Sequence, residues 1–124
     1  MRCSNPIIAV APVTDLELLR FESDGFTNYD LVDAFIGRGK HVREGSPAQN
    51  AERIKAPVLM FHGDLDQNVG IGQSRLMAKR LKNPGQALEL VEFPGLSHQL
   101  DDSEARTKML EKSDAFLRKA MALP

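Results

Sequence analysis

The sequence predicts an α/β fold in which helices cover both faces of a parallel sheet. Three short apolar runs, at residues 7–11, 57–62 and 87–93, have the composition of strands. Segments with helical periodicity separate and follow these runs, so strands and helices alternate along the chain. Alternation of this kind is typical of parallel strands joined by right-handed crossovers. We therefore expect three strands and three or four helices, arranged in three layers.

The first strand and the first helix have residues at their ends that terminate such elements. Pro12 closes the apolar run at 7–11, because proline has no N–H for the ladder of a sheet. Asn28 can cap a helix over residues 29–36, whose apolar side chains fall on one face. Gly37 then supplies a C-terminal stop. The sequence between these two elements is less regular, and no element is predicted there.

A polar loop and a short helix lead to the second strand. Glycine, serine and proline within residues 37–47 are typical of a loop. Pro47 suits the first turn of a helix, which we expect to end at Arg53. Residues 57–62 are then the clearest buried strand of the chain, and Gly63 ends it.

The C-terminal part of the chain reads as helix, strand and helix. A helix is expected over residues 72–81, before the turn sequence at 83–85. Residues 87–93 alternate apolar and acidic side chains, which suits a strand near the edge of a sheet. Asp101 and Glu104 have the spacing of a capping box at the start of the last helix. The apolar stripe of that helix consists of Ala105, Met109, Phe116, Leu117 and Ala120.

Polar side chains follow two of the predicted strands. Asp66 lies shortly after the strand that ends at His62, and His98 lies shortly after the strand that ends at Phe93. Functional groups gather at the carboxyl ends of parallel strands, so this acid and this histidine can lie side by side. They form the acid–base half of a Ser-His-Asp relay, in which the carboxylate fixes the imidazole tautomer and the imidazole moves the serine proton.

Several short motifs surround these two residues. They are residues 9–15, Ser46-Pro47, residues 54–59, His62-Gly63-x-x-Asp66-x-x-Val69, Gln73-Ser74, Phe93-Pro94-Gly95 and His98. Together they resemble the C-terminal part of the catalytic domain of the prolyl oligopeptidase family of serine peptidases. The resemblance covers nearly the whole chain and implies an α/β-hydrolase fold, with Asp66 as triad acid and His98 as triad base. Gly70 is a small departure, because many relatives carry proline near this position.

The nucleophile motif of that family is missing from the sequence. The family's Gly-x-Ser-x-Gly elbow precedes the strand that corresponds to residues 7–11, and no such motif occurs here. Ser74 lies within a predicted helix, and Ser4 has no flanking glycines. We therefore expect residues 1–124 to be the C-terminal portion of a catalytic domain whose nucleophile half is absent. Such a chain would be inactive alone, so its status as an enzyme stays open.

His62-x-Asp64-x-Asp66 also admits an interpretation as a metal site, since histidine and carboxylates bind several cations. Gly63 and the turn-like composition argue against that geometry, and neither a metal nor a cofactor is predicted. Asp64 is interpreted as a turn residue that accepts hydrogen bonds from local backbone N–H groups. His62 is expected to be structural, beneath the loop, and His41 has no assigned role.

The expected absence of the nucleophile half has a consequence for partners. The strand at residues 7–11 would leave one edge of the sheet unpaired. We therefore expect a homo-oligomer formed through that edge, and peptide or small-ester substrates only together with the missing half. The alternative is a truncated, non-catalytic relative that acts as an oligomeric interaction or binding protein.

Composition limits the remaining partners and the compartment. The chain has 16 basic and 17 acidic residues, so a basic nucleic-acid face is not expected. No apolar run approaches the ~20 residues that span a bilayer, so no membrane partner is predicted. Cys3 is the only cysteine, and the first residues do not have the pattern of a secretory signal. We expect a cytoplasmic protein.

Overall fold

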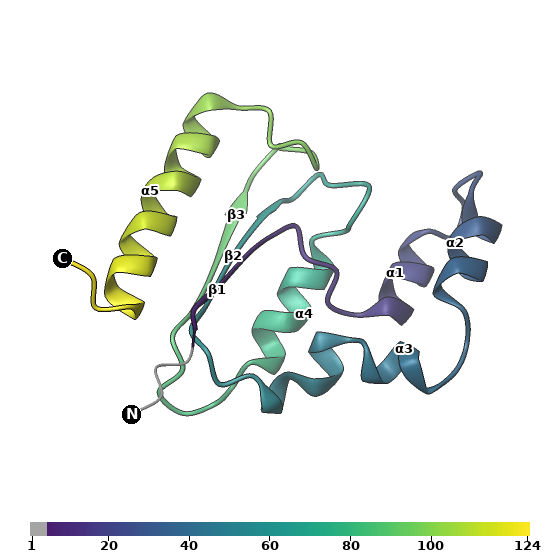
Figure 1. Ribbon diagram of the computed structural model, residues 1–124. Helices are drawn as coiled ribbons and strands as arrows, with labels where there is room; N and C mark the ends of the chain where they lie inside the picture. Colours follow the sequence, from purple (N-terminus) through teal and green to yellow (C-terminus); the bar gives the residue numbers. More distant parts are fainter. Residues whose placement is uncertain (1–4) are drawn as a thin grey trace.

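Three strands alternate with helices in the computed structural model, which describes residues 5–124 (Figure 1). Cys3 and Ser4 lie outside the described residues. In chain order the elements are β1 (Ile7–Val10), α1 (Leu16–Glu22), α2 (Tyr29–Ile36), α3 (Lys40–Glu44), the 3-10 helix η1 (Pro47–Arg53), β2 (Val58–Gly63), α4 (Gly72–Arg80), β3 (Leu88–Phe93) and α5 (Ser103–Ala120). The strands are parallel and lie in the order β1-β2-β3. The predicted parallel α/β sheet is confirmed.

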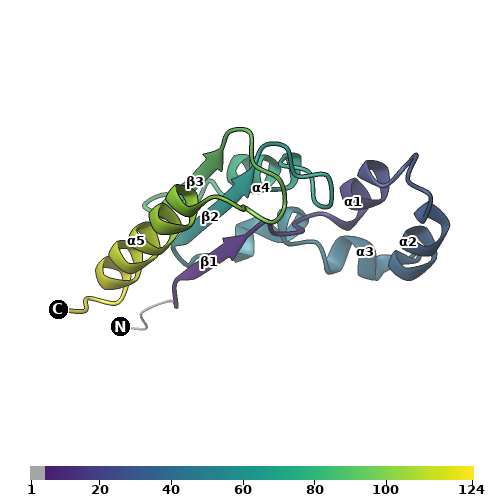
Figure 2. The same ribbon diagram turned by 90° about the horizontal axis from the view of Figure 1, so that it is seen from above.

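Helices cover both faces of this sheet, so the molecule has the three predicted layers (Figures 1 and 2). The core between the sheet, α4 and η1 buries Ala48, Ala51, Val58, Met60, Met77 and Leu81. The core between the sheet and α5 buries Leu59, Phe61, Val91, Phe93, Leu100 and Ala105. The central strand β2 is therefore buried on both faces, as strands of parallel sheets usually are, whereas β1 at the edge is partly exposed.

The central strand β2 is buried along its whole length. Successive side chains of a strand point to opposite faces, so Met60 faces α4 and Phe61 faces α5. The same period of two directs His62 toward α4, where its ring meets a side chain of that helix. The alternation in β2 thus places one imidazole in the α4 layer, beside the carboxyl end of the sheet.

Two short helices were not predicted from the sequence. Asp15 caps α1, because its side chain accepts a hydrogen bond from Leu18 N at 2.8 Å. The helix α3 lies inside the predicted polar loop and follows Gly39, which has no capping side chain. Helices this short depend on tertiary contacts more than on sequence pattern. The described residues contain five α-helices and one 3-10 helix, more than the three or four expected.

The last helix begins one residue later than the capping box predicts. Asp102 is the N-cap, and its side chain accepts a hydrogen bond from Ala105 N at 2.8 Å. The capping box formed by Asp101 and Glu104 is therefore wrong. Leu100 adopts a positive φ of 48°, and the chain after it places Asp102, in extended conformation, over the first turn.

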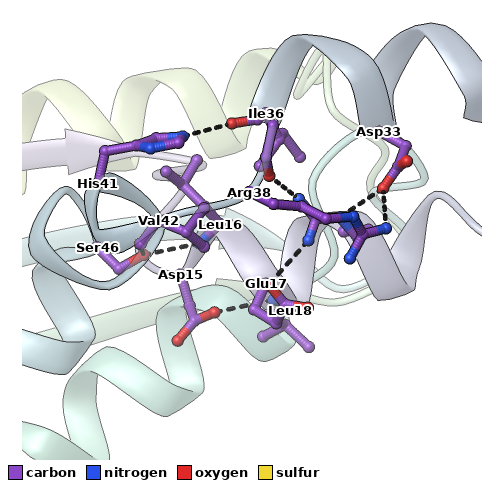
Figure 3. Close-up of polar contacts among 12 residues, drawn as sticks. Asp15, Leu16, Glu17, Leu18, Asp33, Ile36, Arg38, His41, Val42 and Ser46 are labelled. Carbon is purple, nitrogen blue, oxygen red and sulfur yellow. Dashed lines mark hydrogen bonds and ion pairs between the residues drawn. The ribbon is translucent and has the colours of Figure 1, made fainter.

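The helices α1, α2 and α3 extend away from the sheet in both ribbon views, and we call residues 16–44 the helical arm (Figures 1 and 2). Polar contacts join its parts. His41 Nε2 donates a hydrogen bond to Ile36 O at 2.8 Å, and Ser46 Oγ accepts one from Leu16 N at 3.0 Å (Figure 3). His41 thus satisfies a carbonyl at the end of α2. Within residues 5–124, no helix has the length and apolar content needed to cross a bilayer.

Candidate active site

The loops that follow β2 and β3 lie against each other at the carboxyl end of the sheet. Asp64 N donates to Phe93 O at 3.1 Å, and Leu65 N donates to Leu96 O at 3.0 Å. Gly63 permits this approach, because a Cβ at that position would lie 2.3 Å from Leu96 O. A side chain on residue 63 would therefore push the two loops apart.

These loops bring together the two predicted site residues. His98 Nδ1 lies 2.8 Å from Asp66 Oδ2. The side chain of Asp66 has no exposed surface, whereas 35% of the His98 side chain is exposed. The carboxylate is thus enclosed behind an imidazole that reaches solvent. His98 borders a shallow hollow of about 400 Å³, which is lined by Leu65, Gln67, Asn68, Ser97, His98 and Gln99.

The surroundings of Asp66 favour its ionised form. The backbone N–H groups of Asn68 and Val69 both donate to Asp66 Oδ1 at 2.9 Å. Burial alone would raise the pKa of the Asp66 carboxyl, but the hydrogen bonds from Val69, His98 and Asn68 outweigh it and hold the pKa below the ordinary 3.8. Asp66 is therefore a carboxylate at neutral pH.

An ionised carboxylate only accepts hydrogen bonds, and this fixes the state of the neighbouring imidazole. His98 Nδ1 must carry the proton that it shares with Asp66. The lone pair of a neutral His98 then lies on Nε2, which forms no hydrogen bond within residues 5–124. Asp66 thus orients the ring so that its outer nitrogen is free to accept a proton.

A second serine, histidine and aspartate series shares Asp66 but is enclosed. Ser74 Oγ lies 2.7 Å from His62 Nδ1, and both side chains are fully buried. His62 Nε2 donates to Val69 O at 2.7 Å and lies 3.4 Å from Asp66 Oδ2. Substrate has no access to the Ser74 hydroxyl in this arrangement. His62 therefore has the structural position, beneath the loop, that the sequence predicts.

The metal-site interpretation does not agree with the observed contacts. Both ring nitrogens of His62 already have partners, and Asp64 Oδ1 accepts a hydrogen bond from Gly95 N at 2.7 Å. In the described part of the chain, no three His, Cys, Asp or Glu side chains are grouped so that they could hold a metal ion. Asp64 lies in a turn, as predicted, but the prediction that it accepts from local N–H groups is wrong, because its donor Gly95 N belongs to the loop after β3.

Three residues at this end of the sheet were not identified as site residues from the sequence. Gly63 is part of the motif that contains Asp66, but the sequence does not show that it lets the loops after β2 and β3 approach each other. Val69 contributes through its backbone, which sequence patterns do not reveal. Glu22 lies 48 positions before its partner Gly70, so no local signal connects the two.

Solved structures of a peptidase and an esterase have a similar fold. The puromycin-hydrolyzing peptidase of Mycobacterium tuberculosis matches 94% of this chain and 18% of its own, with a TM-score of 0.81 and 24% identity, which shows the fold alone. Thermogutta terrifontis esterase 2 matches 94% of this chain and 41% of its own, with a TM-score of 0.71 and 29% identity. The chain therefore has the architecture of part of the α/β-hydrolase fold.

The chain belongs to the prolyl oligopeptidase family, whose model matches residues 5–123. An uncharacterized peptidase of Bacillus subtilis, YuxL, is 31% identical over 75 residues, which are 60% of this chain and 11% of that protein. The probable chloroplastic glutamyl endopeptidase of Arabidopsis thaliana is 30% identical over 101 residues, which are 80% of this chain and 10% of that protein. The chain thus spans about a tenth of the length of these curated relatives.

Proposed function

We propose that this chain carries the acid and the base of a serine-hydrolase site, with Asp66 as the acid and His98 as the base. The observation that carries the proposal is the 2.8 Å contact between Asp66 Oδ2 and His98 Nδ1, at the carboxyl ends of adjacent parallel strands. Membership of the prolyl oligopeptidase family supports it. The proposed substrates are peptides or small esters, the compounds on which peptidases and esterases act.

In this proposal His98 moves the proton of a serine hydroxyl. Nε2 accepts that proton while the serine oxygen attacks the acyl carbon of the substrate. Asp66 keeps the other ring proton on Nδ1 and stabilises the imidazolium that forms. His98 then returns the proton to the leaving amine or alkoxide, and the acyl group stays on the serine until water releases it.

The proposed nucleophile comes from a polypeptide segment outside this sequence. No serine hydroxyl within residues 5–124 is hydrogen-bonded to His98, and the Ser74 hydroxyl is enclosed against His62. We therefore expect no hydrolysis by the 124 residues alone. A fluorophosphonate probe should not label them, and labelling together with turnover would contradict this part of the proposal.

A chimeric enzyme tests the roles of Asp66 and His98. Residues 5–124 would replace the matching 41% of Thermogutta terrifontis esterase 2, which we expect to contribute the nucleophile. The chimera should hydrolyse a p-nitrophenyl ester. The variant His98→Ala should lower kcat by about 10⁶-fold, and Asp66→Asn should lower it by about 10⁴-fold, because it allows the wrong imidazole tautomer.

Asp64→Asn is the matched control for Asp66→Asn in the chimera. Asp64 lies two positions away in the same loop, and its bond from Gly95 N needs only an oxygen acceptor, which asparagine keeps. The control should retain kcat within a few fold. A chimera that hydrolyses the ester with His98→Ala in place would exclude His98 as the base.

Self-association through β1 is a second candidate function. Within the described residues β1 pairs only with β2, so its other edge carries unpaired backbone groups, and 48% of Val10 is exposed there. A second copy of this chain could pair with that edge. Light scattering at micromolar concentration should then give a dimer or larger species that Val10→Lys converts to a monomer. A monomeric wild-type chain would contradict this candidate.

A further inference from the structure

Glu22 lies at the end of α1 and contacts the far end of the loop that holds Asp66. Its Oε2 accepts hydrogen bonds from Gly70 N and from Gln73 Nε2, both at 3.3 Å. Gly70 lies one residue before Ile71, the N-cap of α4, and Gln73 belongs to the first turn of that helix. One carboxylate thus connects the helical arm with the junction between the acid loop and α4.

Gly70 is the residue that makes room for this carboxylate. A Cβ on residue 70 would lie 2.7 Å from Glu22 Oε1, so the carboxylate at the end of that flexible side chain would have to shift. A proline there would in addition remove the N–H that Glu22 accepts. The contact of Glu22 with the backbone thus depends on a residue at position 70 that has a free N–H and no side chain.

The backbone at Val69 and Gly70 lies between Glu22 and Asp66 and is hydrogen-bonded on both sides. Val69 N donates to Asp66 Oδ1 at 2.9 Å, and Val69 O accepts from His62 Nε2 at 2.7 Å. Glu22 holds the next N–H along the chain. Three consecutive backbone groups are thus held by side chains from α1, β2 and the loop itself.

The buried side chain of Gln73 binds both Glu22 and the backbone just before α1. Its Oε1 accepts from Thr14 N at 2.9 Å and from Asp15 N at 2.8 Å, and its Nε2 donates to Asp15 O at 3.1 Å as well as to Glu22. Gln73 has no exposed surface. One buried side chain therefore connects the start of α1, the end of α1 and the start of α4.

We infer that Glu22 is a positioning residue for the Asp66–His98 pair, acting through Gly70 and Val69. The inference rests on the proposed function, because it gives Glu22 a role in presenting the acid of that site. Glu22 does not touch the reacting atoms. It holds the backbone that supplies the Val69 N–H to the carboxylate of Asp66.

Two effects of Glu22 on Asp66 have opposite signs, and this makes the inference testable. The groups that face Glu22 are His62 from β2, Asp66 from the acid loop, and the Gly70 and Gln73 donors. As a nearby negative charge, Glu22 by itself would raise the pKa of Asp66. As an anchor for Val69, whose N–H lowers that pKa, Glu22 would keep the pKa low. Displacement of the anchor therefore raises the pKa of Asp66, whereas simple removal of the charge lowers it.

The experiment is an NMR titration of the Asp66 carboxyl carbon in the 124-residue chain. Gly70→Ala should displace the Glu22 carboxylate and raise the pKa of Asp66 by about half a unit or more. Gly72→Ala is the matched control, because its Cβ would lie 3.8 Å from Glu22 Oε1, an ordinary contact. Glu22→Gln keeps an oxygen acceptor for Gly70 N and should not raise the pKa. If Gly70→Ala does not fold, Glu22→Ala replaces it. That variant removes both the charge and the acceptor, so its Asp66 pKa should lie above that of Glu22→Gln, which removes the charge alone.

Each outcome of this titration has a defined meaning. A pKa of Asp66 that falls or stays unchanged in Gly70→Ala overturns the inference, and so does a pKa in Glu22→Ala that is no higher than in Glu22→Gln. So does a rise of equal size in Glu22→Gln, because the acceptor would then not matter. The Nδ1 proton signal of His98 in the wild-type chain is read separately. Its absence would contradict the proposed Asp66–His98 pair itself, whereas its presence with an unchanged titration contradicts only the role of Glu22.

Discussion

Hydrogen bonds hold together both the carboxyl end of the sheet and the helical arm, but the two regions differ in the apolar packing that surrounds those bonds. At the carboxyl end, the bonds join two loops that rest on the buried strand β2, and they enclose one carboxylate. In the arm, buried Arg20 donates to Glu17 at 2.9 Å and to Gly37 O, and its Nε lies 2.7 Å from Asp33 Oδ1 without an aligned hydrogen bond. Around this network the arm leaves large apolar side chains in solvent.

This difference shows which part of the chain buries its own apolar side chains and which part leaves them exposed to solvent. The strand ends lie between two apolar cores, so their polar groups are positioned by packing on both sides. The arm contributes little to either core and depends on one guanidinium and its neighbours. We therefore expect the arm to open locally at a lower free energy than the sheet. Four substitutions test this expectation.

Gly63→Ala should have the largest effect. The added Cβ would lie 2.3 Å from Leu96 O, a backbone atom that cannot move without its whole loop. We expect a loss of about 3 kcal/mol in the free energy of unfolding, measured by urea denaturation. Gly72→Ala is the control, since its Cβ meets only ordinary contacts. Equal stability of the two variants would mean that the loops at the carboxyl end are not closely joined.

Arg20→Ala should have the next largest effect, and it should be confined to the arm. Loss of the buried guanidinium leaves the partly enclosed Asp33 with only the exposed Arg38 as a partner. The partial exposure of Asp33 and Glu17 limits the cost to about 2 kcal/mol. Hydrogen exchange should become faster in α1 and α2 and stay slow in β2. Arg38→Ala is the control, because Arg38 pairs with the same Asp33 but is mostly exposed. Equally accelerated exchange in β2 would show that arm and sheet unfold together.

Asp66→Asn should have a smaller effect that depends on pH. The folded-state pKa of Asp66 lies below the ordinary 3.8, so the ionised carboxylate stabilises the folded state at higher pH. At pH 7 we expect the variant to be about 1 kcal/mol less stable. As the pH falls from 3.8 through the folded-state pKa, this difference should disappear. Denaturation of both proteins across that range measures it, and a difference that widens in acid would contradict the assigned shift.

The same contrast explains how much of the structure follows from the sequence. The strands, α4 and the meeting of Asp66 with His98 follow from apolar runs and from the rule that parallel strands end at one edge. The helices α1 and α3 do not, because long-range polar contacts rather than an apolar stripe hold the arm together. No sequence pattern predicts the contact between Glu22 and Gly70, since the two residues lie 48 positions apart in the chain.

Phe35→Ser should have the smallest effect on stability. It tests directly whether the apolar side chains of the arm are exposed to solvent. The side chain of Phe35 is 94% exposed, so it contributes almost no buried area within the described residues. The free energy of unfolding should change by less than about 0.5 kcal/mol. An exposed phenyl ring nevertheless favours contact with other apolar surfaces, so solubility should rise in the variant. A loss of stability beyond that limit would mean that the ring is covered in solution, and that the arm, like the sheet, has a partner.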